Sequence, residues 1–232
     1  MEVVVGNKTP NVEETIFRAA RGDYYSGFVW EESVETLLEG TSNEVETIED
    51  FLHKRMDHEE WGVFEHGIIT FGLKGISREV LAHIARHRHL TLDVQSMRYV
   101  DFSDAEYTIP EVLVNDNYAN RHGEVDISNE EREEAMEKYT AIIEESIEQY
   151  RELVDIGMPV EDARKVLPIA TEVNITLSGN PRALMHVLNL RMKFNAQNET
   201  RELADMMYAE LEDWIPSVCS WYDAHGPLKT SP

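Results

Sequence analysis

The sequence predicts a helix-rich α+β fold that forms a single domain across residues 1–232. Several long segments repeat their apolar residues at helical spacing, whereas runs of β-branched and aromatic residues are short and few. The chain has no internal repeat, low-complexity linker or Pro/Gly-rich hinge, and its 232 residues suffice to bury one sizeable core. An apolar fraction of 42% also indicates a folded protein and not an acidic disordered tail.

The first part of the chain predicts a short strand-forming run, a helix and a longer strand. Val3 to Val5 is a β-prone run, and the segment 43–58 places its apolar residues on one face of a helix. That face consists of Val45, Ile48, Phe51, Leu52 and Met56. The segment 63–73 is rich in β-branched and aromatic residues and ends before a Lys-Gly pair, which is typical of a strand.

A helix and an extended segment are expected next. Ser77 is a suitable N-cap for a helix that runs to about His87. The segment 95–102 has the pattern of extended backbone. We therefore expect Arg86, His87 and Arg88 in the C-terminal turn of the helix, where the helix dipole favours positive charge.

A long amphipathic helix is predicted in the second half. Ser128-Asn129-Glu130-Glu131 has the form of a capping box and begins a helix that ends at about Ile156. Its expected buried stripe consists of Met136, Tyr139, Ile143, Ile147, Tyr150 and Val154. The opposite face is mostly Glu and is expected to be solvated.

Four shorter elements are expected after the long helix. The segment 160–166 predicts a short helix that Pro168 ends, and the segment 171–177 alternates like a strand. Asn180 and Pro181 begin a further helix, with Asn at the N-cap and Pro in the first turn. A last helix is expected over residues 199–214.

The charge balance excludes two classes of partner. The chain carries 45 acidic and 21 basic residues, for a formal net charge of −24. Such an excess of carboxylates repels nucleic acid and anionic membranes. Either the protein is an ordinary acidic cytosolic protein, or it is adapted to high salt, where screening over a few ångströms removes the self-repulsion. We favour the second interpretation.

A cytoplasmic location is expected. No stretch approaches the roughly 18–20 apolar residues that cross a bilayer, and the first residues lack the basic and apolar regions of a secretory signal. The single cysteine, Cys219, excludes an intrachain disulfide and fits a reducing compartment. Because it lies in an aromatic-rich segment without an adjacent Arg or His, we expect a packed thiol and not a nucleophile.

The segment 86–99 is the most informative stretch of the chain, because it holds three arginines and two histidines. Planar guanidinium groups bind phosphates and ionised heterocycles, so anion binding is the favoured interpretation. The alternatives are a surface helix end with scattered histidines, or a zinc site formed by His83, His87 and His89. The arginines that flank His87 disfavour a bound cation, and we predict no metal site.

This stretch carries a resemblance to a known family. Arg86-His87-Arg88, seven residues and then Ser96 resemble the signature motif of the flavin-dependent thymidylate synthases. The segment 60–66 and the run from Arg164 to Arg191 share the resemblance, and together the similar segments cover roughly a third of the chain. The residues that differ from those usual in the family are Glu60, Gly62, His83, Thr91 and Val94.

The resemblance implies the family's fold, with a mixed or antiparallel sheet, and a homotetramer whose active sites draw on several subunits. It also implies reductive methylation of dUMP to dTMP. Methylenetetrahydrofolate would supply the one-carbon unit, and FAD reduced by NADPH would supply the hydride. Arg191 is the expected catalytic residue, because a fixed positive charge beside the uracil ring stabilises its ionised form.

The resemblance further implies the residues that contact substrate and cofactor. The expected substrate-binding residues are His83, Arg86, Val94, Gln95, Ser96, Met97, Arg98, Arg164 and Arg191, with Ser96 and Met97 acting through their backbone. The expected FAD-binding residues are Gly62, Glu65, Arg86, His87, Arg88, Val94, Asn180, Pro181, Arg182 and His186. From the residues alone, the helix start at Asn180 suits an anion, whereas Arg191 equally suits a helix cap or an ion pair.

Two rival functions come from other classes. One is a metal-dependent hydrolase that uses His83, His87 and His89. The other is a non-catalytic nucleotide-binding or regulatory protein whose altered positions have lost the reaction. Visible flavin absorbance separates the first rival from the synthase, and an assay for dTMP separates the second.

Overall fold

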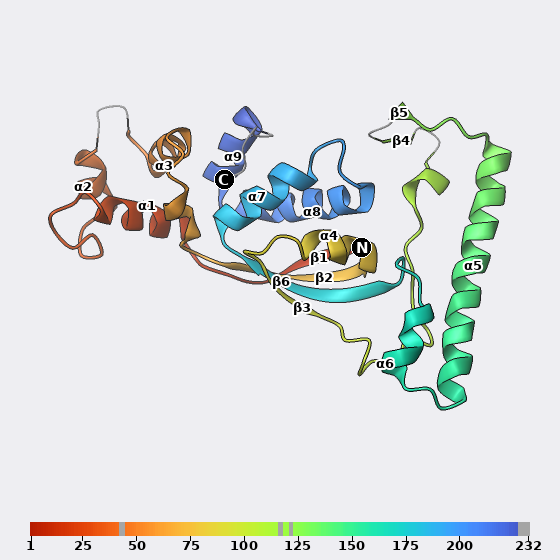
Figure 1. Cartoon of the computed structure of the whole chain (residues 1–232). Helices are drawn as coiled ribbons and strands as arrows, with labels where there is room; N and C mark the ends of the chain where they lie inside the picture. Colours follow the sequence, from red (N-terminus) through yellow and green to blue (C-terminus); the bar gives the residue numbers. More distant parts are fainter. Residues whose placement is uncertain (42–44, 116–117, 121–122, 227–232) are drawn as a thin grey trace.

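A four-stranded antiparallel sheet forms the base of the molecule (Figure 1). The computed structural model describes residues 1–41, 45–115, 118–120 and 123–226. The sheet has the order β1-β2-β6-β3 and consists of β1 (Glu2–Lys8), β2 (Ile69–Ser77), β3 (Thr91–Val94) and β6 (Glu172–Gly179). A separate two-stranded antiparallel sheet pairs β4 (Ala119–Asn120) with β5 (Gly123–Glu124). The α+β fold and its antiparallel sheet are as predicted.

One face of the sheet is apolar and covered, and the other is open. The two central strands bury alternate residues, including Phe71, Leu73 and Leu177, whereas Asn174 and Thr176 between them are exposed. Helices lie along the apolar face (Figure 1). On the opposite face, beside Val94 and Gln95, lies a shallow cavity of about 490 Å³.

Three helices cover the apolar face: α4 (Arg78–Ile84), α7 (Pro181–Arg191) and α8 (Asn198–Trp214). Two predicted N-caps are confirmed, because Ser77 Oγ accepts from the Val80 amide at 3.1 Å and Asn180 Oδ1 accepts from the Ala183 amide at 2.8 Å. Each cap satisfies a backbone donor at the helix start that would otherwise lack a partner.

The predicted end of α4 is wrong. The helix ends at Ile84, so His83 and His87 do not share a helical face, and the Arg86–Arg88 run lies after the helix. The His87 amide donates to the Ile84 carbonyl at 2.9 Å, and the Leu90 amide donates to the His87 carbonyl at 3.2 Å. These two consecutive turns reverse the chain so that it can enter β3.

Five short helices lie at one end of the sheet (Figure 1). They are α1 (Val12–Gly22), α2 (Val34–Glu39), α3 (Ile48–Asp57), η1 (Trp61–Glu65) and α9 (Pro216–His225). The helices α1, α2 and α9 were not predicted, and α9 follows α8, so α8 is not the last helix. Thr47 and Asp50 form a capping box that begins α3 at Ile48, and the expected start at residue 43 lies outside the described residues. The strand expected over 63–73 begins only at Ile69, because η1 occupies its first residues.

A long helix, α5 (Asn129–Asp155), stands at the other end of the molecule, as predicted from its capping box at Ser128 (Figure 1). It covers the connecting segment 101–115, which contains η2 (Glu111–Leu113), and the Tyr139 hydroxyl donates to the Thr108 carbonyl at 2.9 Å. The short helices α6 (Val160–Ala163) and η3 (Arg164–Val166) follow. The prediction of extended backbone over 95–102 is wrong. The Tyr99 and Val100 amides both donate to the Ser96 carbonyl, so the chain forms a turn there.

Buried side chains from the sheet and from most helices form one continuous cluster. Cys219 belongs to it with 4% of its surface exposed, and burial raises the pKa of its thiol to about 12. The packed, unreactive thiol is therefore as predicted. Within the described part of the chain, no helix is both long enough and apolar enough to cross a bilayer.

Candidate active site

Arg191 lies in the last turn of α7 and is held by two neutral acceptors. Its Nε donates to His87 Nε2 at 3.0 Å, and its Nη2 donates to the His83 carbonyl at 3.1 Å. Arg191 and His83 also line a cavity of about 990 Å³. Across the described residues, no carboxylate forms an ion pair with Arg191. Its positive charge is therefore available to a bound anion.

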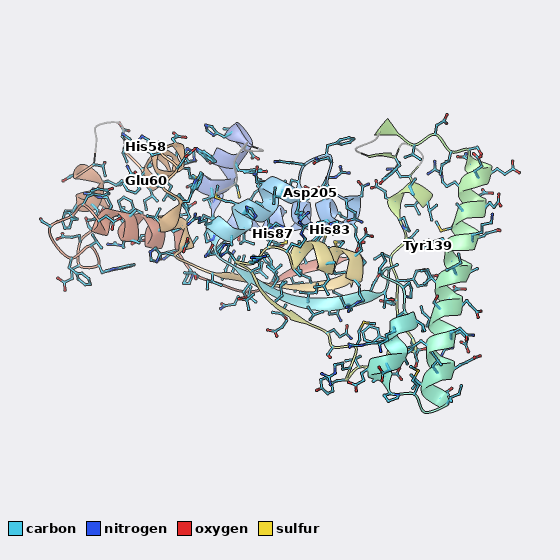
Figure 2. All side chains as sticks on the ribbon, viewed as in Figure 1. His58, Glu60, His83, His87, Tyr139 and Asp205 are labelled. Carbon is cyan, nitrogen blue, oxygen red and sulfur yellow. The ribbon has the colours of Figure 1, made fainter. Side chains whose placement is uncertain are left out.

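His87 is buried, with 5% of its surface exposed, and its ring lies between α4 and α7 next to His83 (Figure 2). Burial, with the positive charge of Arg191, lowers the pKa of His87 to about 4, so the imidazole is neutral near pH 7. Because a guanidinium can only donate, Nε2 must be the acceptor and Nδ1 must carry the hydrogen. That Nδ1 is buried and has no hydrogen-bond partner among the described residues.

Arg86 and Arg88 flank this histidine and are exposed. Within the described chain, neither forms an ion pair with a carboxylate, although acidic residues outnumber basic ones 45 to 21. His186, one turn before the end of α7, contacts the His87 ring edge-on at 5.2 Å between centroids. The first half of the motif therefore presents two free guanidinium groups beside a neutral imidazole pair.

A second group of expected cofactor residues lies at the start of α7. Arg182 Nη1 donates to Glu65 Oε1 at 2.6 Å, which joins α7 to η1. Gly62, also on η1, faces open space, because a side chain placed there would meet no atom within 4 Å. Asn180 uses its side-chain oxygen as the helix cap, with Pro181 in the first turn, so the Asn180 amide nitrogen is the group left for a ligand.

The second half of the motif lies at the far end of β3. Arg98 Nε donates to the Glu161 carboxylate at 2.9 Å, and Arg164 Nε donates to the Glu161 carbonyl at 3.0 Å. Two expected nucleotide-binding arginines are thus brought together. Met97 is buried, with 4% of its surface exposed.

Gln95 and Val94 connect this group to the sheet. The Gln95 amide donates to the Asn174 carbonyl at 2.8 Å, and its side-chain oxygen accepts from the Asn174 amide at 3.2 Å. At about 3.3 Å per residue, the strand residues between Thr91 and Gln95 span about 13 Å. No hydrogen bond or ion pair in the described chain joins Ser96, Arg98 or Arg164 to Arg191. Arg98 and Arg164 are thus held by Glu161, whereas Arg191 is held by His83 and His87.

The structure also shows residues that the sequence analysis missed. Glu199 accepts from the Ser77 amide at 2.9 Å and from the Ser77 hydroxyl at 2.7 Å, and burial raises its pKa. Thr200 Oγ1 lies 3.3 Å from His83 Nδ1. Tyr139 and Glu79 line the same cavity as Arg191, and Figure 2 shows Tyr139 on α5, away from the helical layer. No spacing in the sequence links these residues, because they meet only through tertiary packing.

One residue that departs from the family pattern, Glu60, has a local partner at the start of η1. Glu60 forms an ion pair with Arg55 at 2.6 Å, across the connection from α3 to η1.

No three His, Cys, Asp or Glu side chains of the described residues group together in a way that could hold a metal. The zinc alternative with His83, His87 and His89 therefore has no support in the geometry.

Comparisons with known proteins identify the family of the chain. The family described as "Thymidylate synthase complementing protein" matches residues 4–217. A flavin-dependent thymidylate synthase of Haloarcula marismortui is 39% identical over 96% of this chain and 95% of its own length. The enzyme of the same name from Halobacterium salinarum is 36% identical over 97% of this chain and 96% of its own length.

A solved structure shares the fold. The UMP/dUMP methylase PolB from Streptomyces cacaoi, bound with 5-Br dUMP, superposes with a TM-score of 0.83 and 20% identity, over 100% of this chain and 97% of that one. The sequence matches define the protein as an enzyme of the flavin-using class. The chain belongs to the flavin-dependent thymidylate synthase family, and the resemblance seen in its motifs is confirmed.

Proposed function

We propose that the protein converts dUMP to dTMP by reductive methylation, with methylenetetrahydrofolate as one-carbon donor and FAD reduced by NADPH as hydride source. The observation that carries this proposal is the uncompensated charge of Arg191 on a cavity of about 990 Å³. Family membership and the names of the haloarchaeal relatives support it. The proposal treats residues 1–232 as one catalytic domain.

Arg191 would act on the pyrimidine ring. A guanidinium that is already fixed and not neutralised stabilises negative charge as it develops on the ring, without a reorganisation cost. Arg98 and Arg164 would hold the phosphate, together with the backbone of Ser96 and Met97. The residues left to contact the base are His83, Arg86, Val94 and Gln95.

The residues around η1, α4 and α7 fit a flavin dinucleotide. His87 Nδ1 is a buried donor without a partner, Gly62 borders open space, and Arg86 and Arg88 are free to meet a pyrophosphate. The other expected contacts are Glu65, Asn180, Pro181, Arg182 and His186. When bound, the reduced flavin would supply the hydride, whereas the protein binds, orients and polarises the reactants.

We further propose a homotetramer with shared sites, as family membership suggests. Arg191 is held by His83 and His87, whereas Arg98 and Arg164 are held by Glu161, and a second subunit would bring the two groups to one substrate. Inactive Arg191→Ala and Arg164→Ala proteins should then regain activity when they are mixed as unfolded chains and refolded together. Light scattering should give the tetramer mass, and a monomer with full activity would contradict shared sites.

The function is tested with the purified protein. We expect visible flavin absorbance, a spectral change on addition of dUMP, and dTMP formation from dUMP, methylenetetrahydrofolate and NADPH. A protein that stays colourless in excess FAD would contradict the flavin proposal and favour the hydrolase rival. A protein that binds FAD and dUMP but forms no dTMP would be the non-catalytic rival.

A further inference from the structure

The side chain of Arg191 is fixed from two directions. His87 Nε2 takes the hydrogen of Arg191 Nε, and the carbonyl at the end of α4 takes one hydrogen of Nη2. Together the two contacts restrict the orientation of the guanidinium group. Both N–H groups of Nη1 and one of Nη2 are not used by these bonds, and they remain for a ligand in the cavity.

His87 is itself held rigidly. Its amide and carbonyl take part in the two turns that follow α4, and its ring packs edge-on against His186. Because 5% of its surface is exposed, no water replaces Arg191 at Nε2 without a rearrangement of the packed layer. The imidazole is therefore a fixed acceptor, separated by 104 positions in sequence from the arginine that it contacts.

We propose that His87 is a positioning residue, which as the Nδ1–H tautomer accepts from Arg191 Nε and fixes the guanidinium plane while leaving its charge intact. A carboxylate in the same place would hold the arginine equally well but would neutralise it. The consequence for turnover rests on the proposed function, whereas the tautomer and the hydrogen bond do not.

Burial first, and then the groups that face the imidazole, keep it neutral. Arg191 and His186 face it from α7, and Arg86 faces it from the turn after α4. All three disfavour a positive charge on the ring. Protonation would remove the acceptor and place two positive charges in contact, so Arg191 would be released.

Nuclear magnetic resonance of protein labelled with ¹⁵N-histidine tests the tautomer directly. His87→Gln identifies the His87 signals by difference. We expect a protonated Nδ1 and an unprotonated Nε2 at neutral pH, in protein without added ligand. A protonated Nε2, or an imidazolium, would overturn the proposal because neither accepts a hydrogen bond from Arg191.

Two variants separate the acceptor from mere packing. Gln places an amide oxygen near the position of Nε2, whereas Leu fills the space without an acceptor. In ¹⁵N-arginine spectra, we expect the Arg191 Nε hydrogen to exchange about tenfold faster in His87→Leu than in the wild type or His87→Gln. Equal exchange in all three proteins would refute the hydrogen bond.

Turnover at saturating FAD tests whether the positioning role of His87 affects the reaction. We expect kcat for dTMP formation to fall about 100-fold in His87→Leu, with a much smaller change in KM for dUMP, and to be largely restored in His87→Gln. His58→Gln, at the exposed end of α3, is the control for loss of a histidine and should leave kcat unchanged. Unchanged kcat in folded His87→Leu would overturn the positioning role. If the wild type forms no dTMP, the proposed function fails, and the spectra still decide the hydrogen bond.

Discussion

Glu65 and Arg182 form an ion pair of 2.6 Å that joins η1 to the first turn of α7. Both side chains are partly exposed, at 53% and 39%, so the pair contributes little to folding stability. Its consequence is geometric. The pair fixes the side chains of two expected FAD contacts against each other, next to the open space at Gly62.

Loss of this pair should weaken FAD binding more than folding. We expect Glu65→Gln and Arg182→Gln each to lower the free energy of unfolding by less than about 1 kcal/mol. The Kd for FAD should rise about tenfold or more, because a charge-assisted contact is lost. Fluorescence titration with FAD and urea unfolding measure the two quantities. Lys8→Gln breaks the Lys8–Asp213 pair, also 2.6 Å, and is the matched control that should leave FAD binding unchanged.

Removal of the Arg191 guanidinium should abolish most turnover. We expect kcat for dTMP formation to fall by about 100- to 1,000-fold in Arg191→Ala, since the charge that stabilises the reacting ring is lost. Arg191→Lys keeps the charge without the planar fork, so its kcat should lie between that of the wild type and that of Arg191→Ala. Full turnover in Arg191→Ala would exclude this side chain from the reaction.

The depressed pKa of His87 predicts a specific loss of stability in acid. Its pKa falls from 6.5 to about 4 on folding, so the unfolded chain binds more protons between these values. The contribution is complete above about pH 6.5 and decreases as pH falls toward 4, by at most roughly 3 kcal/mol. Urea unfolding of wild type and His87→Gln across this range isolates the contribution from that of the carboxylates. Parallel pH curves for the two proteins would show that His87 is not the group responsible.

Cys219 should be dispensable for turnover. Its thiol is buried and its pKa is raised to about 12, so almost no thiolate forms near neutral pH. We expect Cys219→Ala to retain the wild-type rate and to lose about 1 kcal/mol of stability from lost packing. A folded Cys219→Ala protein without activity would point to a thiolate mechanism instead.

The net charge of −24 predicts that salt stabilises the fold. Ions at molar concentration screen repulsion beyond about 3 Å, which relieves the crowded carboxylates on surfaces such as that of α5. We expect Tm to rise between dilute buffer and molar KCl. A lower Tm in molar salt would rule out adaptation to high salt.

Local signals predicted much of the fold. The caps at Ser77, Ser128 and Asn180 were predictable because each depends on a side chain that bonds an amide three residues away. The helix α1 was not predicted, although Val12, Ile16, Phe17 and Ala20 form an apolar stripe. Unlike the three caps above, its N-cap Asn11 has left-handed backbone and forms no side-chain capping bond. α9 follows α8 so closely that only Pro216 marks its start.

The site was less predictable than the fold. The motif indicated anion binding because guanidinium chemistry is visible in residue types. The contact between Arg191 and His87 was not predictable, since it depends on how α7 packs over the turns after α4. The same holds for Glu199, whose carboxylate caps Ser77 across 122 positions of sequence.

The four residues of β3 fix the number of residues between the two halves of the motif. Arg88 and Ser96 are separated by a strand whose register with β6 is fixed from Thr91 to Val94. Deleting one residue of β3 would reverse which side of the sheet the following residues up to Gln95 face, and deleting two would retract Arg98 by about 7 Å from Glu161. The segment between Arg88 and Ser96 should therefore accept substitutions more readily than insertions or deletions.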